Sequence, residues 1–292
     1  MIEYAGWEMR RDLAALWQEC FHDPKRYPEY FLNNIFLPRN TLVYRAGQEL
    51  AAAVYLIPAQ LLTRSGTVPA HYIFAAATAP KFRSHGYMSS LLAYAALAGA
   101  ARGDCCSILL PSDDGLYRFY AAAGYKDFFR VRMAEVSAET LKAASDREGC
   151  PGHFLPDMRA LNFLRRKVLT GNSGSMLWDD RMFHFSVGMN VIYGDRMVTA
   201  VKGGKSAYAL CHREESICTV LEAAADTDTF PALSAAVLRD MPAESYRFRL
   251  PENSPLFSGA GECMRFGMIK PLGGWNLSDA GASCPYLGLT MD

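Results

Sequence analysis

Residues 80–91 read PKFRSHGYMSSL, and they directly follow the apolar run HYIFAAATA at residues 71–79. The run has the composition of a buried strand, and the residues after the loop continue as a long Ala/Leu helix. The first turn of such a helix has backbone N–H groups without intrahelical acceptors, which attract anions. The stretch therefore predicts an anion site. The backbone N–H groups that would bind the anion belong to Ser84, His85, Gly86, Tyr87 and Met88.

Basic side chains surround this turn. Lys81, Arg83 and His85 add positive charge to the helix dipole. Gly86 has no side chain and lets the backbone approach a phosphate closely. We therefore expect a cofactor that carries a pyrophosphate. On these residues alone, the alternative that Gly86 only starts a helix and that the basic side chains are solvated stays open.

The composition argues against several classes of function. The 292 residues suffice for one large or two ordinary domains, and 30 basic residues balance 30 acidic ones. A neutral chain has no overall field that attracts nucleic acid or an anionic membrane, so we expect neither as a partner. The apolar stretches are shorter than the roughly 18 to 20 residues of a membrane span, and the N-terminus lacks a signal-peptide core, so we expect a cytoplasmic protein. Eight cysteines without C-x-x-C spacing predict reduced structural thiols and no metal site.

The order of the expected elements indicates an α/β protein. Two short helices precede an antiparallel meander, and a strand, helix, strand, helix, strand unit with a parallel pair follows. A weak helix then leads to the breakers Gly149, Pro151 and Gly152, which predict a domain boundary. The expected helices cover residues 12–36 as a pair, 86–101 and 113–123, and the expected strands cover 40–47, 49–68, 70–79, 106–111 and 125–136.

The second half contains an echo of the first. LLPSDDGLYRFYAAAGYKDFFRVRMAEV, which starts at Leu109, aligns with RLPENSPLFSGAGECMRFGMIKPL, which starts at Arg249. This self-similarity predicts a tandem duplication. In the second copy Asp226 and Asp228 stand where the first has basic residues, and the turn lacks a glycine. Carboxylates at a helix start repel phosphate, so we expect no anion site there.

Two ordered motifs carry a resemblance to a known family. The pattern Ala77-Thr78-x-Pro80-x-x-Arg83-x-x-Gly86-x-Met88 resembles the acyl-CoA signature R-x-x-G-x-G/A of the GCN5-related N-acetyltransferases, the GNAT superfamily, with the A-T-x-P that precedes it. LYRFYAAAGYKDF resembles the later motif Y-x-x-x-G-F. The form LP…GLY…GY with a degenerate second copy is most similar to the tandem-GNAT, Eis-like branch. Two features depart from the family pattern: Met88 replaces a small residue, and the strand before the loop lacks the acidic residue of many members.

The resemblance implies a fold and a domain arrangement. The class is α/β (α+β): a GNAT fold with a mixed, mostly antiparallel sheet and a parallel splayed strand pair, followed by a second, degenerate GNAT-like domain. A catalytic GNAT domain that binds acyl-CoA is expected over residues 1–136, a linker over 137–154, and a degenerate domain without a CoA loop over 155–292.

The resemblance also implies an activity. It is an N-acetyltransferase that transfers an acetyl group from acetyl-CoA to a primary amine by direct attack in a ternary complex. The acceptor is an unidentified small-molecule or peptide amine, and a homo-oligomer is left open. Two rivals are a Fem-like aminoacyl transferase on a tandem GNAT fold and a non-catalytic acyl-CoA-binding or protein-interaction module.

By the same resemblance, Ala76, Ala77 and Thr78 hold the pantetheine arm, in addition to the loop residues that bind the pyrophosphate. Tyr120 matches the motif tyrosine and is our first choice for the general acid, because a phenol can return a proton to a thiolate. Tyr117 is the competing choice, from the Eis-like segment SDDGLY.

The sequence leaves alternatives open for the general base. The base is either a water chain that ends at Asp113, Asp114 or His71, or the C-terminal carboxylate of Asp292. The helical pair at residues 12–36 is expected to form one wall of the acceptor site. Its candidate substrate-binding residues are Asp23, Tyr27 and Tyr30, with Phe31 beside them.

Overall fold

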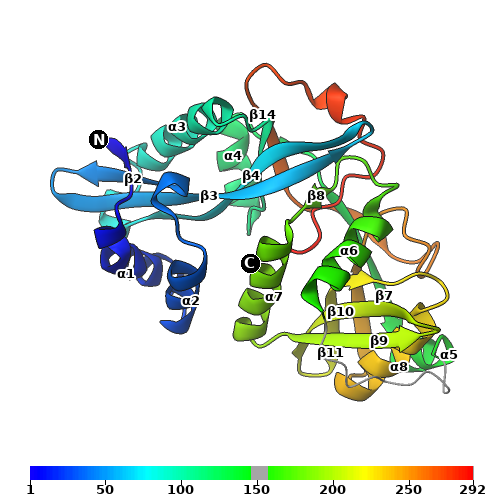
Figure 1. Ribbon diagram of the computed structural model, residues 1–292. Coiled ribbons are helices and arrows are strands. Elements are labelled where there is room, and N and C mark those ends of the chain that lie inside the picture. The colour runs from blue at the N-terminus through cyan, green and yellow to red at the C-terminus, as the bar shows by residue number, and fades with distance from the viewer. Residues whose placement is uncertain (146–156, 292) are drawn as a thin grey trace. The chain divides into compact units, whose positions relative to one another are not determined.

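The chain forms two compact units, each built around its own sheet (Figure 1). The structure, a computed structural model, describes residues 1–145 and 157–291. Unit 1 comprises Met1–Leu61, Ser65–Phe128 and Gly267–Ala280, and unit 2 comprises Leu62–Arg64, Phe129–Phe266 and Gly281–Asp292. The predicted breakers at 149–152 and part of the predicted linker lie outside the described residues.

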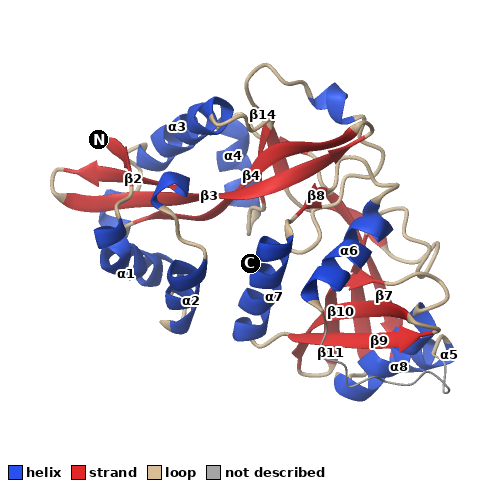
Figure 2. Ribbon diagram, viewed as in Figure 1, coloured by secondary structure: helices blue, strands red, loops and turns tan. Residues whose placement is uncertain are grey.

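Unit 1 is built on a mixed sheet with the strand order β1-β2-β3-β4-β5-β14-β6 (Figure 2). The pair β2·β3 is antiparallel, as predicted for the meander, and so is β1·β2, although no strand was predicted at β1. The pair β4·β5 is parallel. The strands are β1 Ile2–Tyr4, β2 Thr41–Ala46, β3 Glu49–Thr63, β4 Gly66–Thr78, β5 Cys106–Leu109, β6 Lys126–Asp127 and β14 Met268–Pro271.

Helices cover both faces of this sheet. Side chains alternate between the two faces along each strand, so neighbouring residues of one strand contact different helices. Val54 and Ile73 belong to the core cluster that contains residues of α3 and α4. Their chain neighbours Tyr55 and Phe74 instead contact the ring of Trp17 on α1, with centroids 6.2 and 5.5 Å away. The helices are α1 Arg10–Phe21, α2 Arg26–Asn34, α3 Tyr87–Ala101 and α4 Asp114–Ala122, with 3₁₀ turns at Trp7–Met9, Pro38–Asn40, Pro80–Phe82 and Leu277–Ala280.

Unit 2 contains a second mixed sheet, with the order β13-β7-β12-β11-β10-β9. Only β11 and β12 are parallel among its described pairs. The strands are β7 Arg130–Ser137, β9 Arg196–Lys202, β10 Lys205–Glu214, β11 Ile217–Ala224, β12 Ser245–Leu250 and β13 Glu262–Arg265. The short β8 Met176–Leu177 is not part of this sheet and pairs with β3. The helices are α5 Ala138–Ala143, α6 Met158–Leu169, α7 Asp180–Tyr193 and α8 Phe230–Asp240.

The two sheets exchange one strand between the halves of the sequence. In unit 1, β14 from the second half lies between β5 and β6 and is antiparallel to both. In unit 2, β7 from the first half lies between β12 and β13 and is antiparallel to both. The echo aligns β5 with β12, so the two units repeat one arrangement with the last strand swapped.

This exchange changes the element expected over 125–136. The run YKDFFRVRMAEV was predicted as one strand of the first domain, but it forms β6 in unit 1 and β7 in unit 2. The units therefore differ from the predicted ranges 1–136 and 155–292 at β7 and at Gly267–Ala280. The reason is physical: β7 alternates polar and apolar residues as any half-buried strand does, and this pattern does not select the partner strand.

None of the helices in residues 1–145 and 157–291 has the length and apolar character that crossing a bilayer requires. The cysteines in the same ranges are all free thiols. Within those ranges no three histidine, cysteine, aspartate or glutamate side chains gather in the way that a metal ion needs.

A buried ion pair organises the core of unit 2. The Arg165 Nε atom donates to both carboxylate oxygens of Glu222, at 2.9 and 3.1 Å, and both side chains are almost fully buried. The same carboxylate accepts from the Tyr208 hydroxyl at 2.7 Å and from the backbone N–H of Leu289 at 2.8 Å. The pair thus ties α6, β10 and β11 to the C-terminal segment, with each charge satisfied.

We expect Arg165→Met to lower the free energy of unfolding by about 3 to 5 kcal/mol, because it leaves the Glu222 carboxylate buried without its cation. Urea unfolding followed by circular dichroism measures this. The control is Arg247→Met, whose exposed pair with Glu135 at 3.1 Å should contribute no more than about 1 kcal/mol. Equal losses in the two variants would contradict the proposed role of the buried pair.

Candidate functional site

The site begins where β4 separates from β5. Their parallel ladder pairs Ala70 with Cys106 and ends at Tyr72 and Ile108, yet β4 continues to Thr78. Ala75, in the continuing part, has a φ of 43°, a left-handed conformation that is uncommon for a residue with a side chain. The splayed parallel pair predicted from the sequence is therefore present.

The loop after β4 turns its backbone toward the start of α3. Ser84 and Gly86 both have positive φ, at 67° and 75°. Gly86 is the N-cap of α3 and therefore provides no side-chain cap, and a Cβ added to it would meet no atom within 4 Å. The N–H groups of the first turn thus face open space without a side-chain acceptor in the described structure, as an anion site requires.

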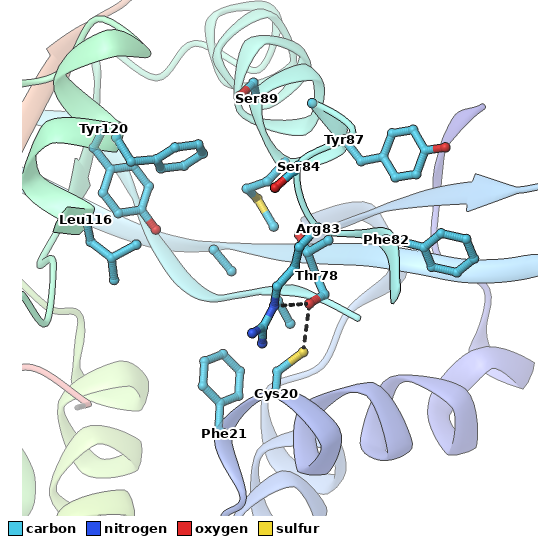
Figure 3. A pocket seen from close by; sticks show the side chains of 15 residues that line it. Cys20, Phe21, Thr78, Phe82, Arg83, Ser84, Tyr87, Ser89, Leu116 and Tyr120 are labelled. Atoms are coloured by element: carbon cyan, nitrogen blue, oxygen red, sulfur yellow. Dashed lines mark hydrogen bonds between the residues drawn. The ribbon is translucent and has the colours of Figure 1, made fainter. Parts of the chain in front are cut away.

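A cavity of about 480 Å³ lies where the splayed strand, this loop and α4 meet (Figure 3). All of its lining residues belong to unit 1. Nine of the predicted site residues line it, namely Ala76, Ala77, Thr78, Arg83, Ser84, Gly86, Tyr87, Met88 and Tyr120. Tertiary structure thus gathers, around one hollow, residues that the sequence places up to 44 positions apart (Ala76 to Tyr120).

The basic side chains near the loop have different surroundings. Arg83 lines the cavity, and its Nε donates to the carbonyl of Thr78 at 3.3 Å. Lys81 instead forms an ion pair with Glu49. His85 does not line the cavity; its Nδ1 lies 2.8 Å from the carbonyl oxygen of Arg83, and its ring stacks on Tyr87. Of the three predicted cations, Arg83 alone is placed to meet a ligand.

The two candidate tyrosines occupy different places although both are buried. The Tyr117 hydroxyl accepts a hydrogen bond from the backbone N–H of Gly267, at 3.0 Å. That contact holds the start of the exchanged strand β14, and Tyr117 is not among the lining residues. Tyr120 lines the cavity, and Figure 3 shows its hydroxyl directed into it. The geometry favours Tyr120 over Tyr117 as the group that meets a ligand.

The predicted acceptor-wall residues do not line this cavity. The Asp23 carboxylate accepts from the Trp17 indole N–H at 2.8 Å. Tyr27 is buried, and the Arg26 guanidinium lies over its ring. Burial raises the pKa of Tyr30 above its ordinary value. Their role in binding an acceptor stays a prediction.

The candidate bases also lie outside the lining. Asp113 is the N-cap of α4 and accepts from the N–H of Leu116 at 2.8 Å, and Asp114 is the first residue of that helix. His71 is completely buried, with its Nδ1 2.7 Å from the Asp104 carboxylate. Asp292 lies outside the described residues.

Several lining residues were not expected from the sequence. They are Cys20, Phe21, Phe82, Ser89, Leu116 and Phe119. Cys20 and Phe21 are the last two residues of α1. The Cys20 thiol donates to the Thr78 carbonyl at 3.3 Å, which joins α1 to the splayed strand. Only a motif that linked α1 to the loop could have found them, and the sequence has none.

Comparison with known proteins agrees with this geometry. Residues 4–127 match the model of the acetyltransferase (GNAT) domain. Residues 4–127 therefore have the fold of a GNAT domain. The matched region contains the splayed strand, the loop, α3 and α4. None of the curated proteins compared with the chain matches it.

Solved structures extend the likeness over both units. A GCN5-related N-acetyltransferase from Kribbella flavida superposes with a TM-score of 0.74 at 15% identity, over 94% of this chain and 71% of that one. One from Anabaena variabilis gives 0.74 at 15% identity, over 92% and 72%. Eis1 from Mycobacterium abscessus gives 0.69 at 12% identity, over 93% and 73%. At these identities the likeness concerns the fold alone: a GNAT fold followed by a second GNAT-like domain.

The buried His71 network predicts a pH dependence of stability. Burial lowers the pKa of His71, although its hydrogen bond to Asp104 acts in the opposite direction. Burial would raise the pKa of Asp104, but hydrogen bonds with His71 and Arg102 outweigh it and lower that pKa. The unfolded chain therefore binds a proton at His71 at pH values where the folded chain does not.

We expect the free energy of unfolding to fall as the pH drops below about 6.5, by up to about 1.4 kcal/mol per pH unit, until the folded His71 protonates. His71→Asn keeps an N–H donor toward Asp104 but cannot titrate. Urea unfolding is measured at pH values from 7 to 5, about every half unit. The free energy of unfolding should change less with pH in the variant than in the wild type. Parallel profiles for the two proteins would refute this assignment.

Proposed function

We propose that unit 1 is an N-acetyltransferase that transfers an acetyl group from acetyl-CoA to a primary amine by direct attack in a ternary complex. The observation that supports this proposal most is that three parts line one cavity: the splayed end of β4, the uncapped N-terminus of α3, and the Tyr120 hydroxyl. An anion site, an extended backbone edge and an acid in one hollow are what a pyrophosphate-bearing thioester donor needs.

The residues present fit such a donor. We assign the pyrophosphate to the N–H groups of Ser84 to Met88, since a Cβ on Gly86 would enter open space. Arg83 supplies positive charge beside them. We assign the pantetheine arm to Ala76, Ala77 and Thr78, because this part of β4 runs beyond its ladder with β5 and can pair like a sheet edge.

When bound, the donor supplies an activated acyl thioester. The acceptor nitrogen, as a neutral amine, attacks the thioester carbonyl; a C–N bond forms and the C–S bond breaks. Tyr120 donates its hydroxyl proton to the departing sulfur and regains a proton from solvent. The lining residues described in the structure include no carboxylate or imidazole, so we assign the proton released by the amine to water. Positioning of the reactants contributes much of the rate.

We propose that unit 2 does not bind acyl-CoA. In unit 2 the helix that connects the two strands of the parallel pair, β11 and β12, is α8, and the Asp226 carboxylate binds the turn just before this helix. That carboxylate accepts from the N–H of Asp228 at 3.1 Å and of Thr229 at 2.8 Å. An acidic side chain that already satisfies these donors leaves no place for a phosphate.

We expect acetyl-CoA to bind the wild type with one-to-one stoichiometry in a calorimetric titration. The double variant Gly86→Glu and Arg83→Glu should weaken binding at least about 100-fold, because a carboxylate enters the anion site and a cation is lost. Gly194→Glu is the control, since Gly194 also has positive φ and open space around it but ends α7 in unit 2. A folded wild type that does not bind acetyl-CoA would overturn the proposed function.

We expect Tyr120→Phe to lower kcat by about 10² to 10³ while the dissociation constant for acetyl-CoA stays unchanged, because the acid acts only on the leaving sulfur. Tyr117→Phe should instead reduce stability by about 1 kcal/mol through the lost bond to Gly267, with most of the turnover kept. Thiol release measured with a screen of primary amines gives the rate. A larger loss of turnover in Tyr117→Phe would reverse the assignment of the acid.

A further inference from the structure

Two exposed apolar side chains converge on the cavity. Phe21 at the end of α1 is 41% exposed, and Leu116 on α4 is 36% exposed. Both belong to the small set of large apolar side chains that the described structure leaves exposed, and both line this one hollow. Exposed apolar groups that gather around a cavity mark a binding surface rather than chance exposure.

The cavity differs in polarity between its two sides. Ser84 and Tyr87, at the start of α3, lie on one side in Figure 3, and Leu116 and Tyr120 lie on the opposite side. The first side presents backbone N–H groups, and the second presents Leu116 and the Tyr120 hydroxyl. Phe21 lines the same cavity from the end of α1, beside Cys20 and the Arg83 guanidinium. A matching ligand is anionic at one end and apolar at the other.

The charged groups that line the cavity disfavour a cationic ligand. Arg83 is the only charged side chain among the described lining residues, and it is a cation. Cys20, next to Phe21, stays a neutral thiol, because burial raises its pKa despite the nearby Arg83 guanidinium. Nothing in this wall would balance an ammonium group, whereas an uncharged hydrocarbon chain needs no partner.

The position of Phe21 is set by the end of α1. The next residue, His22, is left-handed with a φ of 59°, and its N–H bonds to the carbonyl of Gln18 at 3.0 Å, so the helix stops there. The Phe21 ring packs edge-on against Trp17, with centroids 5.7 Å apart. Trp17 itself is buried in the aromatic cluster under the sheet. The apolar wall is therefore held in place before a ligand arrives.

We infer that this apolar side receives the acyl chain of the donor and that the site therefore binds acyl-CoA donors with a chain longer than acetyl, in addition to acetyl-CoA and more tightly. The inference rests on the proposed function, because it takes the ligand to be an acyl-CoA. The carbonyl of the donor must lie beside Tyr120 for the acid to reach the sulfur. Leu116 lies one helical turn before Tyr120, so the first carbons after the carbonyl meet Leu116, and a longer chain extends within the same cavity toward Phe21.

The experiment is a set of calorimetric titrations without an acceptor. The ligands are CoA, acetyl-CoA, butyryl-CoA and hexanoyl-CoA, and the proteins are the wild type, Phe21→Ala, Leu116→Ala and Phe21→Leu. Each methylene removed from water should tighten binding by about two- to fourfold. We expect hexanoyl-CoA to bind the wild type at least about tenfold more tightly than acetyl-CoA.

The variants should distinguish the binding energy of the acyl chain from that of the CoA part of the donor. Phe21→Ala and Leu116→Ala should each reduce the gain from the longer chain by at least about threefold and leave the affinity for CoA unchanged. Phe21→Leu should keep most of the gain. The control is Phe163→Ala, because Phe163 is 71% exposed on α6 and lies outside the cavity.

Each result has one meaning. Tighter binding of longer chains that the two alanine variants reduce supports the inference. If CoA and acetyl-CoA bind but chain length has no effect, the inference is wrong and the proposed function stands. If longer chains bind more tightly but both alanine variants behave like the wild type, the chain lies elsewhere and the inference is also wrong. If no ligand binds the folded wild type, the proposed function fails, and the inference fails with it.

Discussion

The separation of β4 from β5 is the constraint on which the site depends. A parallel ladder that continued to Thr78 would use the backbone groups of β4 for pairing and would close the space between the strands. The ladder ends at Tyr72 instead, and Ala75 takes a left-handed conformation. The strand can then present its edge to a ligand, and the following loop starts α3 at the same cavity. The left-handed Ala75 is tolerated because buried side chains on both faces hold the strand in the sheet.

The exchange of β7 and β14 has a second consequence. It makes each sheet depend on both halves of the sequence, so neither half contains all the strands of its own unit. Tyr117 holds the point where β14 enters unit 1, through the N–H of Gly267. This explains how two tyrosines one helical turn apart take different roles. One bonds the backbone of the exchanged strand, and the other faces the cavity.

The sequence predicted the local segments that meet at the cavity. The loop, the start of α3 and the tyrosine motif are contiguous segments, and their geometry follows from backbone rules that act over a few residues. It did not predict Cys20, Phe21, Leu116 or Phe119 as lining residues, because helical spacing identifies an apolar face without identifying what that face meets. The same limit applied to 125–136, whose strand pattern is equally compatible with either sheet.

By itself the sequence determined the fold class, the elements around the loop, the glycine turn that starts α3 and the presence of a second, similar domain, because each is written in local pattern or in self-similarity. Only the tertiary structure decided which sheet receives β7 and β14, which of Tyr117 and Tyr120 faces the cavity, and that α1 contributes an apolar wall. These outcomes depend on contacts between residues far apart in the chain. Such contacts are selected by packing of the whole core, and no short window of sequence contains that information.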